Sequence, residues 1–194
     1  MTGIVSPMTE LILIAGLTFV IVLAANSLYN WLVELDRRCE QASADIDVQL
    51  RQRDDLIPNL VAVVKGYAAH ESGTLEAVAR ARSAAMAAPA GTDRAQTELA
   101  LGSALGRLFA VAEQYPDLKA SAAFLQLQGE IGDIENRIAA ARRFLNNAVR
   151  EYNTTLAQFP ANVLAAICRF AHRDPGIIPP GSRGAIDKAP MAAF

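Results

Sequence analysis

The sequence contains few of the residues from which most metal and redox centres are built. Its 194 residues include only two cysteines and two histidines. Cys39 and Cys168 lie far apart and outside any CxxC pattern, so neither a zinc site nor an imidazole-based metal centre is expected. The formal net charge of −2 provides no basic field to attract nucleic acid, and no nucleic-acid partner is expected.

Glycine, proline and aromatic residues are also scarce over most of the chain. Aromatic residues make up 6 %, and glycine and proline concentrate near the C-terminus. Long alanine-rich stretches without such breaks favour helix, and we predict an all-α protein. The sequence has no Gly-rich phosphate loop, nucleophile elbow or HExxH motif. We therefore expect no enzymatic activity and no cofactor, and single out no catalytic, cofactor-binding or metal-ligating residue.

A long uncharged stretch near the N-terminus predicts a membrane anchor. No charged residue occurs from Leu11 to Val33, which is long enough for a helix to cross the hydrocarbon core. A cleaved signal peptide and a buried core helix are the competing interpretations. A signal peptide should begin with Lys or Arg, and residues 1–10 contain neither. We predict that residues 1–34 form an N-terminal flank and a single transmembrane helix in the inner cell membrane.

The distribution of arginines around this stretch predicts its orientation. Positions 37, 38, 51 and 53 are arginines, and the short N-terminal flank has no basic residue. Because basic residues tend to stay on the cytoplasmic side, the rest of the chain is expected in the cytoplasm and the N-terminus outside.

Beyond the anchor, apolar residues recur at steps of three and four, which is the spacing of a buried helical stripe. The first helix is predicted to continue to about Ala69, with Pro58 interrupting and kinking it. Shorter helices are predicted over 71–88 and from about 92 to 113. In the second of these, Gly102 and Gly106 would allow close backbone approach.

A fourth helix carries the most regular stripe and ends at Phe159-Pro160. Its spacing over about five heptads resembles a coiled-coil seam. The seam consists of Phe124, Leu127, Ile131, Ile134, Ile138, Ala141, Leu145, Ala148, Tyr152, Thr155 and Phe159.

Helix lengths then predict the architecture. Two long and two short helices fit an antiparallel four-helix bundle over residues 35–160, which continues the transmembrane helix. Residues 161–171 should form a short apolar helix, too short to span a bilayer. This helix either lies on the membrane surface or adds a last turn to the core. Residues 172–194 are rich in proline and glycine and are predicted to be a flexible tail.

Polar residues on the long helices raise one chemical alternative. Carboxylates cluster on the first and fourth helices, but the Glu-x-x-His pairs of a di-metal bundle are absent. Ion pairing of Asp54 and Asp55 with Arg51 and Arg53 explains the first cluster. Four asparagines are interpreted as half-buried residues that fix helix register: Asn59, Asn136, Asn147 and Asn153.

Five strings of sequence resemble the LemA family: IDVQLRQRDDLIPNLVAVVKGYAAHE, EQYPDLKAS, ENRIAAARRF, VREYN and FPAN. They follow the family's order over most of Asp45–Asn162, after its N-terminal membrane helix. The resemblance implies a bacterial membrane protein with a four-helix bundle and no established catalytic function. Some relatives belong to magnetosome membranes. The chain departs from the family at Leu145-Asn146, where a tyrosine usually precedes the asparagine, and in its tail, which lacks the common aromatic ending.

Three functions are compatible with the sequence. The preferred hypothesis is a membrane scaffold or adaptor of the cell envelope that presents its bundle to unidentified membrane or envelope proteins. The second is a sensor of the lipid bilayer that acts through the C-terminal apolar helix. The third is a ligand-binding or enzymatic bundle, which a deep polar pocket would favour. Association into a homo-oligomer is compatible with each.

Overall fold

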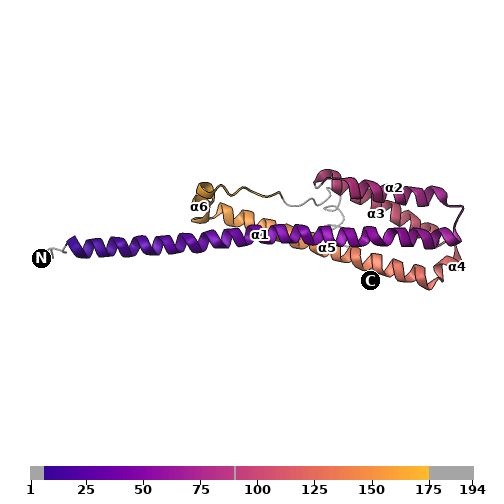
Figure 1. Ribbon diagram of the computed structural model, residues 1–194, viewed down its shortest axis with the longest axis horizontal. Coiled ribbons are helices and arrows are strands. Elements are labelled where there is room, and N and C mark those ends of the chain that lie inside the picture. The colour runs from indigo at the N-terminus through magenta and orange to yellow at the C-terminus, as the bar shows by residue number, and fades with distance from the viewer. Residues whose placement is uncertain (1–6, 90, 175–194) are drawn as a thin grey trace, which may run out of the picture. The chain divides into compact units, whose positions relative to one another are not determined.

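The computed structural model describes residues 7–89 and 91–174, and every regular element within these ranges is an α-helix (Figure 1). The all-α prediction is confirmed for this part of the chain. The predicted tail lies outside the described residues beyond Asp174. In chain order the helices are α1 (Pro7–Tyr67), α2 (Ser72–Ala87), α3 (Thr92–Ala112), α4 (Pro116–Lys119), α5 (Ala122–Ala157) and α6 (Ala161–Cys168).

The chain divides into two compact units, and the long helices α1 and α5 contribute to both. The first unit takes residues 1–41 and 147–173, which include the N-terminal part of α1, the last turns of α5, and α6. The second unit takes the rest of α1 and α5, between residues 42 and 146, together with α2, α3 and α4.

The N-terminal part of α1 is long and apolar enough to cross a membrane, and none of its most apolar stretch is buried. Large side chains from Leu11 to Leu23 are half or more exposed. This exposure excludes a core helix as the interpretation of the stretch. Leaving apolar area in water costs roughly 25 cal/mol per Å², so a continuous surface of this kind makes the protein membrane-associated.

Beyond that stretch, α1 packs in the first unit beside the last turns of α5. The two helices run in opposite directions there (Figure 1). Arg38 and Glu151 form an ion pair at 3.5 Å between them. The buried residues that the two helices contribute are Leu32, Leu35, Cys39, Ala148, Val149, Tyr152, Thr155 and Leu156.

The second unit has a core to which α1, α2, α3, α4 and α5 all contribute. Helices α2 and α3 pack directly against each other. A smaller cluster joins Leu50 of α1 to Ile134 and Ile138 of α5, and the predicted place of these two isoleucines in a buried seam is confirmed. The main cluster consists of Ile57, Leu60, Val64, Ala68, Leu75, Val78, Ala85, Leu101, Ala104, Leu105, Leu108, Ala112, Leu118, Phe124 and Ile131.

The predicted seam of α5 is correct at most positions. Leu127, Ala141 and Leu145 are half-buried, and the other positions up to Thr155 are buried. Phe159 is the error, because α5 ends at Ala157 and the Phe159 side chain is 83 % exposed.

Three further predictions need correction. Helix α1 continues without interruption through Pro58. A separate short helix, α4, follows Tyr115, because the chain leaves helical geometry before α5 begins. Gly102 and Gly106 mediate no close approach, since a Cβ atom added at either would have no neighbour within 4 Å.

Candidate functional site

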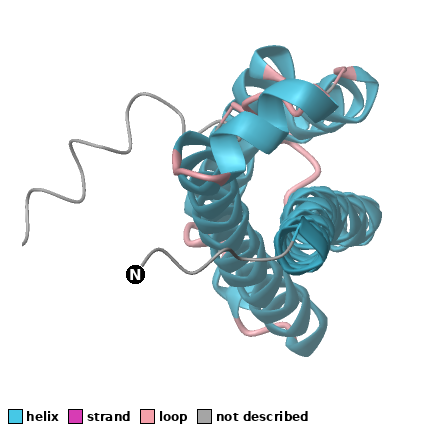
Figure 2. Cartoon of the chain, turned by 90° about the vertical axis from the view of Figure 1, so that its left-hand side faces the viewer, coloured by secondary structure: helices cyan, strands magenta, loops and turns pink. Residues whose placement is uncertain are grey.

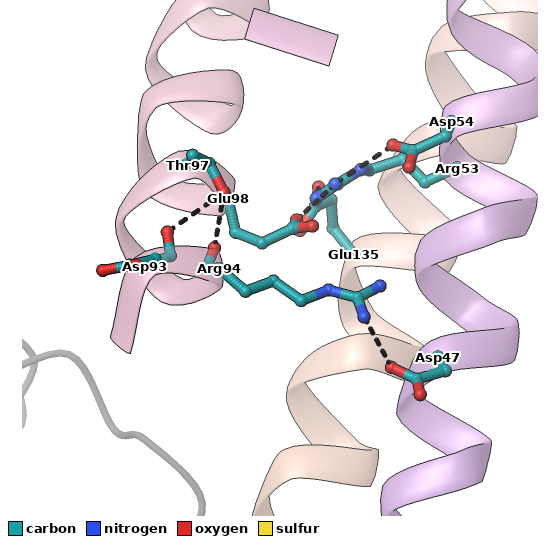
Figure 3. A network of polar contacts seen from close by, with 8 residues as sticks. All are labelled: Asp47, Arg53, Asp54, Asp93, Arg94, Thr97, Glu98 and Glu135. Atoms are coloured by element: carbon teal, nitrogen blue, oxygen red, sulfur yellow. Dashed lines mark hydrogen bonds and ion pairs between the residues drawn. The ribbon is translucent and has the colours of Figure 1, made fainter. Parts of the chain in front are cut away.

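A buried arginine lies at the centre of the second unit's polar contacts. The Arg53 side chain on α1 is 2 % exposed. Its guanidinium donates to Asp54 Oδ1 at 3.3 Å, to Glu135 Oε1 of α5 at 3.1 Å, and to Glu98 of α3. Figure 3 shows these side chains converging from three helices. We call Arg53, Asp54, Glu98 and the partly exposed Glu135 the buried ionic network.

Two further arginines connect neighbouring helices to α1. Arg94 of α3, one turn before Glu98, forms an ion pair with Asp47 of α1 at 3.1 Å (Figure 3). Arg82 of α2 donates from Nε to the backbone carbonyl oxygen of Asp54 at 2.7 Å. The network and its two neighbours therefore connect α1 to α2, α3 and α5.

The contact of Arg82 has a local cause in the sequence. Asp54 lies four residues before Pro58, so its carbonyl would normally accept the N–H of residue 58. Proline has no N–H, and the carbonyl is left without its helical donor. Arg82 supplies that donor from another helix. Pro58 thus creates a polar attachment point for α2 within α1.

The network is not fully satisfied by protein atoms. Buried polar atoms without a partner among the described residues include Arg53 Nε, Arg94 Nε, Glu98 Oε1 and Gln49 Oε1. Leaving such atoms unpaired costs about 1–3 kcal/mol each. Buried water molecules, which typically make about three hydrogen bonds each, are suited to bridging atoms of this kind.

At Arg53 and at Asp54, burial and the neighbouring charges shift the pKa in opposite directions. Burial lowers the pKa of Arg53, but attraction to Glu98 and Glu135 outweighs it and the pKa is raised. Burial raises the pKa of Asp54, and the nearby Arg53 guanidinium only partly offsets that rise. Arg53 is therefore held charged, whereas the charged form of Asp54 is disfavoured.

A buried ionic network of this kind determines which helices pack together more than it increases the free energy of unfolding. Desolvating several charges costs several kcal/mol per ion, and good ion pairing roughly offsets that cost. A packing that moved Arg53 away from Glu98 would leave both charges buried and unpaired. The network consequently favours one pairing of α1 with α3 and α5.

A surface groove of about 360 Å³ lies elsewhere in the second unit. Ligand pockets of this size are mostly apolar with a few polar groups. Four of the seven lining residues of this groove are charged and two are apolar, although the stems of the long polar side chains also contribute apolar surface. The lining residues are Gln52, Asp55, Leu56, Glu130, Asp133, Ile134 and Arg137.

In the first unit, a second polar cluster holds the segment that follows α6. Arg173 donates to Asp36 Oδ1 at 2.7 Å and to Glu40 Oε1 at 3.2 Å, both on α1. Asn153 of α5 exchanges two hydrogen bonds with the Arg173 backbone, at 2.7 and 3.0 Å. The Tyr152 hydroxyl donates to the Ala171 carbonyl at 3.1 Å. The end of this segment is thereby attached to both long helices.

The structure separates the carboxylates that the sequence grouped together. Asp54 pairs with Arg53 as predicted, whereas Asp55 is exposed and lines the groove. Glu135 joins the ionic network, while Glu130 and Asp133 line the groove. Within the described residues, no group of three or more Asp, Glu, His or Cys side chains is arranged to hold a metal ion.

The predicted half-burial of the asparagines is confirmed at one position of four. Asn153 is half-buried and makes the contacts described above. Asn59, Asn136 and Asn147 are exposed, so their predicted role in fixing register is wrong.

Glu98 and Glu135 were not predicted from the sequence as partners of Arg53, although a signal for Glu98 was present. Leu50, Arg53 and Ile57 follow the steps of three and four of the buried stripe on α1. Glu98 and Leu101 have the same spacing on α3. Charged residues of opposite sign therefore occupy core positions on two helices, which is the pattern of a buried ion pair.

Comparison with known proteins connects this arrangement to a family. Magnetosome protein MamQ 2 and magnetosome protein MamQ 1 of Paramagnetospirillum magneticum are each 27 % identical to this chain over 191 aligned residues, covering 84 % of it and 70 % of their own lengths. Magnetosome protein MamQ of Magnetospirillum gryphiswaldense is 26 % identical over 168 residues, covering 73 % of this chain and 62 % of its own.

The profile of the LemA family matches residues 42–178, which include the ionic network and the groove. A match over well more than half of the sequence establishes the relationship, and the chain belongs to the LemA family.

Proposed function

We propose that this protein is a membrane-anchored scaffold without catalytic activity, in which α1 crosses the inner membrane once and carries a four-helix bundle built from α1, α2, α3 and α5. One observation carries the proposal: the exposed apolar stretch and the helix that enters the ionic network are parts of the same unbroken α1. The relatives named as magnetosome proteins are consistent with a role in organising a membrane compartment.

The groove supports a scaffold over an enzyme. Four of its seven lining residues are charged, and the carboxylates of Asp55, Glu130 and Asp133 lie at a surface rather than in a dry cavity. Catalytic carboxylates usually depend on burial to shift their pKa into a working range. The groove is better suited to contact with another protein.

The anchor is tested by extraction from membranes. Full-length protein should stay in the membrane fraction after alkaline carbonate treatment, and a chain beginning at Asp36 should be released. Recovery of the full-length protein in the supernatant would refute the anchor.

The proposed orientation places the second unit in the cytoplasm, following the arginines at 37, 38, 51 and 53. A reporter protein that is active only in the cytoplasm should be active when it is fused after Phe194. Activity of a reporter that requires the periplasm would reverse the assignment.

The scaffold role is tested by crosslinking in living cells. Exposed apolar side chains of the second unit include Leu99 and Leu125, each 51 % exposed. A photo-crosslinking amino acid placed at position 99 or at position 125 should trap a discrete protein adduct if that position contacts a partner. The same amino acid at Ala139, an exposed small residue of α5, is the control for random collision. Adducts that are absent or equal at all three positions would contradict this proposal.

A second candidate function, sensing of the lipid surface, is favoured by one observation. Large apolar side chains of α6 are exposed, in the same unit as the predicted transmembrane part of α1.

A further inference from the structure

Helix α6 has the reverse of the usual amphipathic arrangement. Ala161 and Ala165 form its buried side, at 3 % and 6 % exposure. Val163 and Ile167 lie on the opposite side and are 52 % and 73 % exposed, and Phe159 precedes the helix with its ring exposed. A helix of a soluble protein turns its larger apolar residues inward. In α6 the buried residues are two alanines, whereas Val163 and Ile167 are exposed and Leu164 is half-buried.

The direction of α6 is set within the first unit. Figure 1 shows α6 nearly end-on while the N-terminal part of α1 runs along the plane of the picture, and Figure 2 shows α6 lengthwise. The two views agree that α6 lies crosswise to that part of α1. Its eight residues are about 12 Å long, far short of the ~30 Å hydrocarbon core. A helix crosswise to a spanning helix lies in the plane of the membrane.

An aromatic contact sets the level of α6 along α1. The rings of Phe170, just after α6, and Tyr29 of α1 lie 5.9 Å apart between centroids. Tyr29 and the partly exposed Trp31 lie near the C-terminal end of the uncharged stretch Leu11–Val33 of α1. Tyrosine and tryptophan at such a position mark the interface between hydrocarbon and water. The C-terminal end of α6 is therefore at the headgroup level.

Charge near α6 complements an anionic surface. The sequence has no Asp or Glu from Tyr152 through Arg173. Arg173 is engaged with Asp36 and Glu40, whereas Arg169 at the end of α6 is exposed and makes no ion pair within the described part of the chain. An exposed guanidinium beside an apolar helix face is suited to a lipid phosphate.

We propose that α6 is a second membrane contact, in which Phe159, Val163 and Ile167 enter the headgroup and upper acyl region and Arg169 binds the phosphate of an anionic phospholipid. The proposal rests on the membrane anchor of the proposed function. It adds a defined surface, a depth and a lipid class to that function.

The test uses the full chain reconstituted in lipid vesicles, with Cys39→Ala and Cys168→Ala as background. A polarity-sensitive fluorophore is attached at Ile167→Cys or Val163→Cys, and at Leu125→Cys as the matched exposed control in the second unit. Nitroxide lipids and aqueous iodide serve as quenchers. One set of vesicles is phosphatidylcholine, and the other is an equal mixture with phosphatidylglycerol.

The labels at 163 and 167 should be quenched by nitroxide lipids several-fold more than the label at 125, and shielded from iodide. The phosphatidylglycerol mixture should increase lipid quenching at 167, and Arg169→Gln should remove that increase. Equal lipid quenching at 167 and 125 would overturn the membrane contact. Shielding from both quenchers would also overturn it, because a second copy of the chain would then cover the face. An unchanged effect of phosphatidylglycerol in Arg169→Gln would overturn the phosphate contact.

A label at Val20→Cys separates this proposal from the anchor. If the label at position 20 is quenched by deep nitroxides and the label at 167 is not, the anchor stands and the contact by α6 is wrong. If the label at position 20 itself is not quenched, the anchor fails.

Discussion

The Nε of Arg82 lies 2.7 Å from the backbone carbonyl oxygen of Asp54, the carbonyl that Pro58 deprives of its helical donor. The Asp54 carbonyl of α1, which lacks its helical donor, thus accepts a hydrogen bond from Arg82 of α2. Proline in a helix interior usually costs about 3 kcal/mol, partly through the lost bond. Here the freed carbonyl gains a charged donor, and such bonds contribute about 1.5–3 kcal/mol.

The first prediction tests this relationship by a double-mutant cycle. Arg82→Met should lower the free energy of unfolding by about 1–3 kcal/mol, since it leaves the Asp54 carbonyl unpaired. In a Pro58→Ala background, Arg82→Met should lower the free energy of unfolding by less, because alanine at position 58 restores the N–H that the Asp54 carbonyl accepts. Urea unfolding of the detergent-solubilised chain, followed by circular dichroism, gives the four values. Arg80→Met, which removes only an exposed ion pair on α2, is the control. Equal costs of Arg82→Met in both backgrounds would show that the proline and the arginine are not coupled.

The second prediction concerns the centre of the buried ionic network. Arg53→Met should destabilise the protein by about 3–5 kcal/mol, because Glu98 and Asp54 remain buried without their cation. Adding Glu98→Gln should recover part of the loss. Arg51→Met, at an exposed position two residues away, should change stability by no more than about 0.5 kcal/mol. Similar unfolding curves for the two methionine variants would be incompatible with a network that organises the second unit.

The third prediction follows from the raised pKa of Asp54. Between the ordinary value of 3.8 and the higher pKa in the folded state, the folded protein binds more protons at this group than the unfolded chain does. The contribution of Asp54 to stability therefore falls as pH rises through that window. Asp54→Asn removes this dependence. Its Tm relative to the wild type should be higher at about pH 7 than at about pH 3.5.

The exposed neighbour supplies the control for this pH experiment. Asp55→Asn removes the same charge from α1 at a position that lies in the surface groove. A pH-dependent Tm difference of equal size in Asp54→Asn and Asp55→Asn would mean that net charge, and not burial of Asp54, is responsible.

The fourth prediction uses the open space around two helical glycines. Gly102→Ala and Gly106→Ala should each stabilise the protein by about 0.4–1 kcal/mol, because the added methyl meets no neighbour and the unfolded chain loses entropy. Gly91→Ala is the matched opposite case, since Gly91 has φ +123°, which strains any L-residue. In thermal unfolding, the two helical variants should have a higher Tm than the wild type, and Gly91→Ala should have a lower Tm. Destabilisation by the helical substitutions would show that α3 does approach another backbone there.

Local features predicted the helices well, because the information that defines them is local. The break at APAGTD, residues 88–93, predicted the end of a helix over 71–88, close to Ser72–Ala87. The steps of three and four in α5 likewise predicted the burial of Ile131, Ile134 and Ile138.

The ionic network could not be predicted to the same degree. The sequence close to Arg53 offers Asp54 and Asp55, and local pairing with both was the prediction. Its other partners, Glu98 and Glu135, come from α3 and α5 and are brought near only when these helices pack. Tertiary packing therefore decides which of the many carboxylates in the chain pair with Arg53. For the same reason Asn136 and Asn147, which look like register residues in the sequence, lie in water.

The contacts of Arg173 have a consequence for the energetics of α6. An isolated helix of eight residues is not stable in water, because nucleation costs more than so few hydrogen bonds return. Here α5 leads into the helix, and after it Asn153, Asp36 and Glu40 hold the chain at Arg173. The entropy of ordering α6 is thus lost when the protein folds, not when it meets a surface. Such preorganisation allows a helix of barely two turns to bind without a coupled folding step.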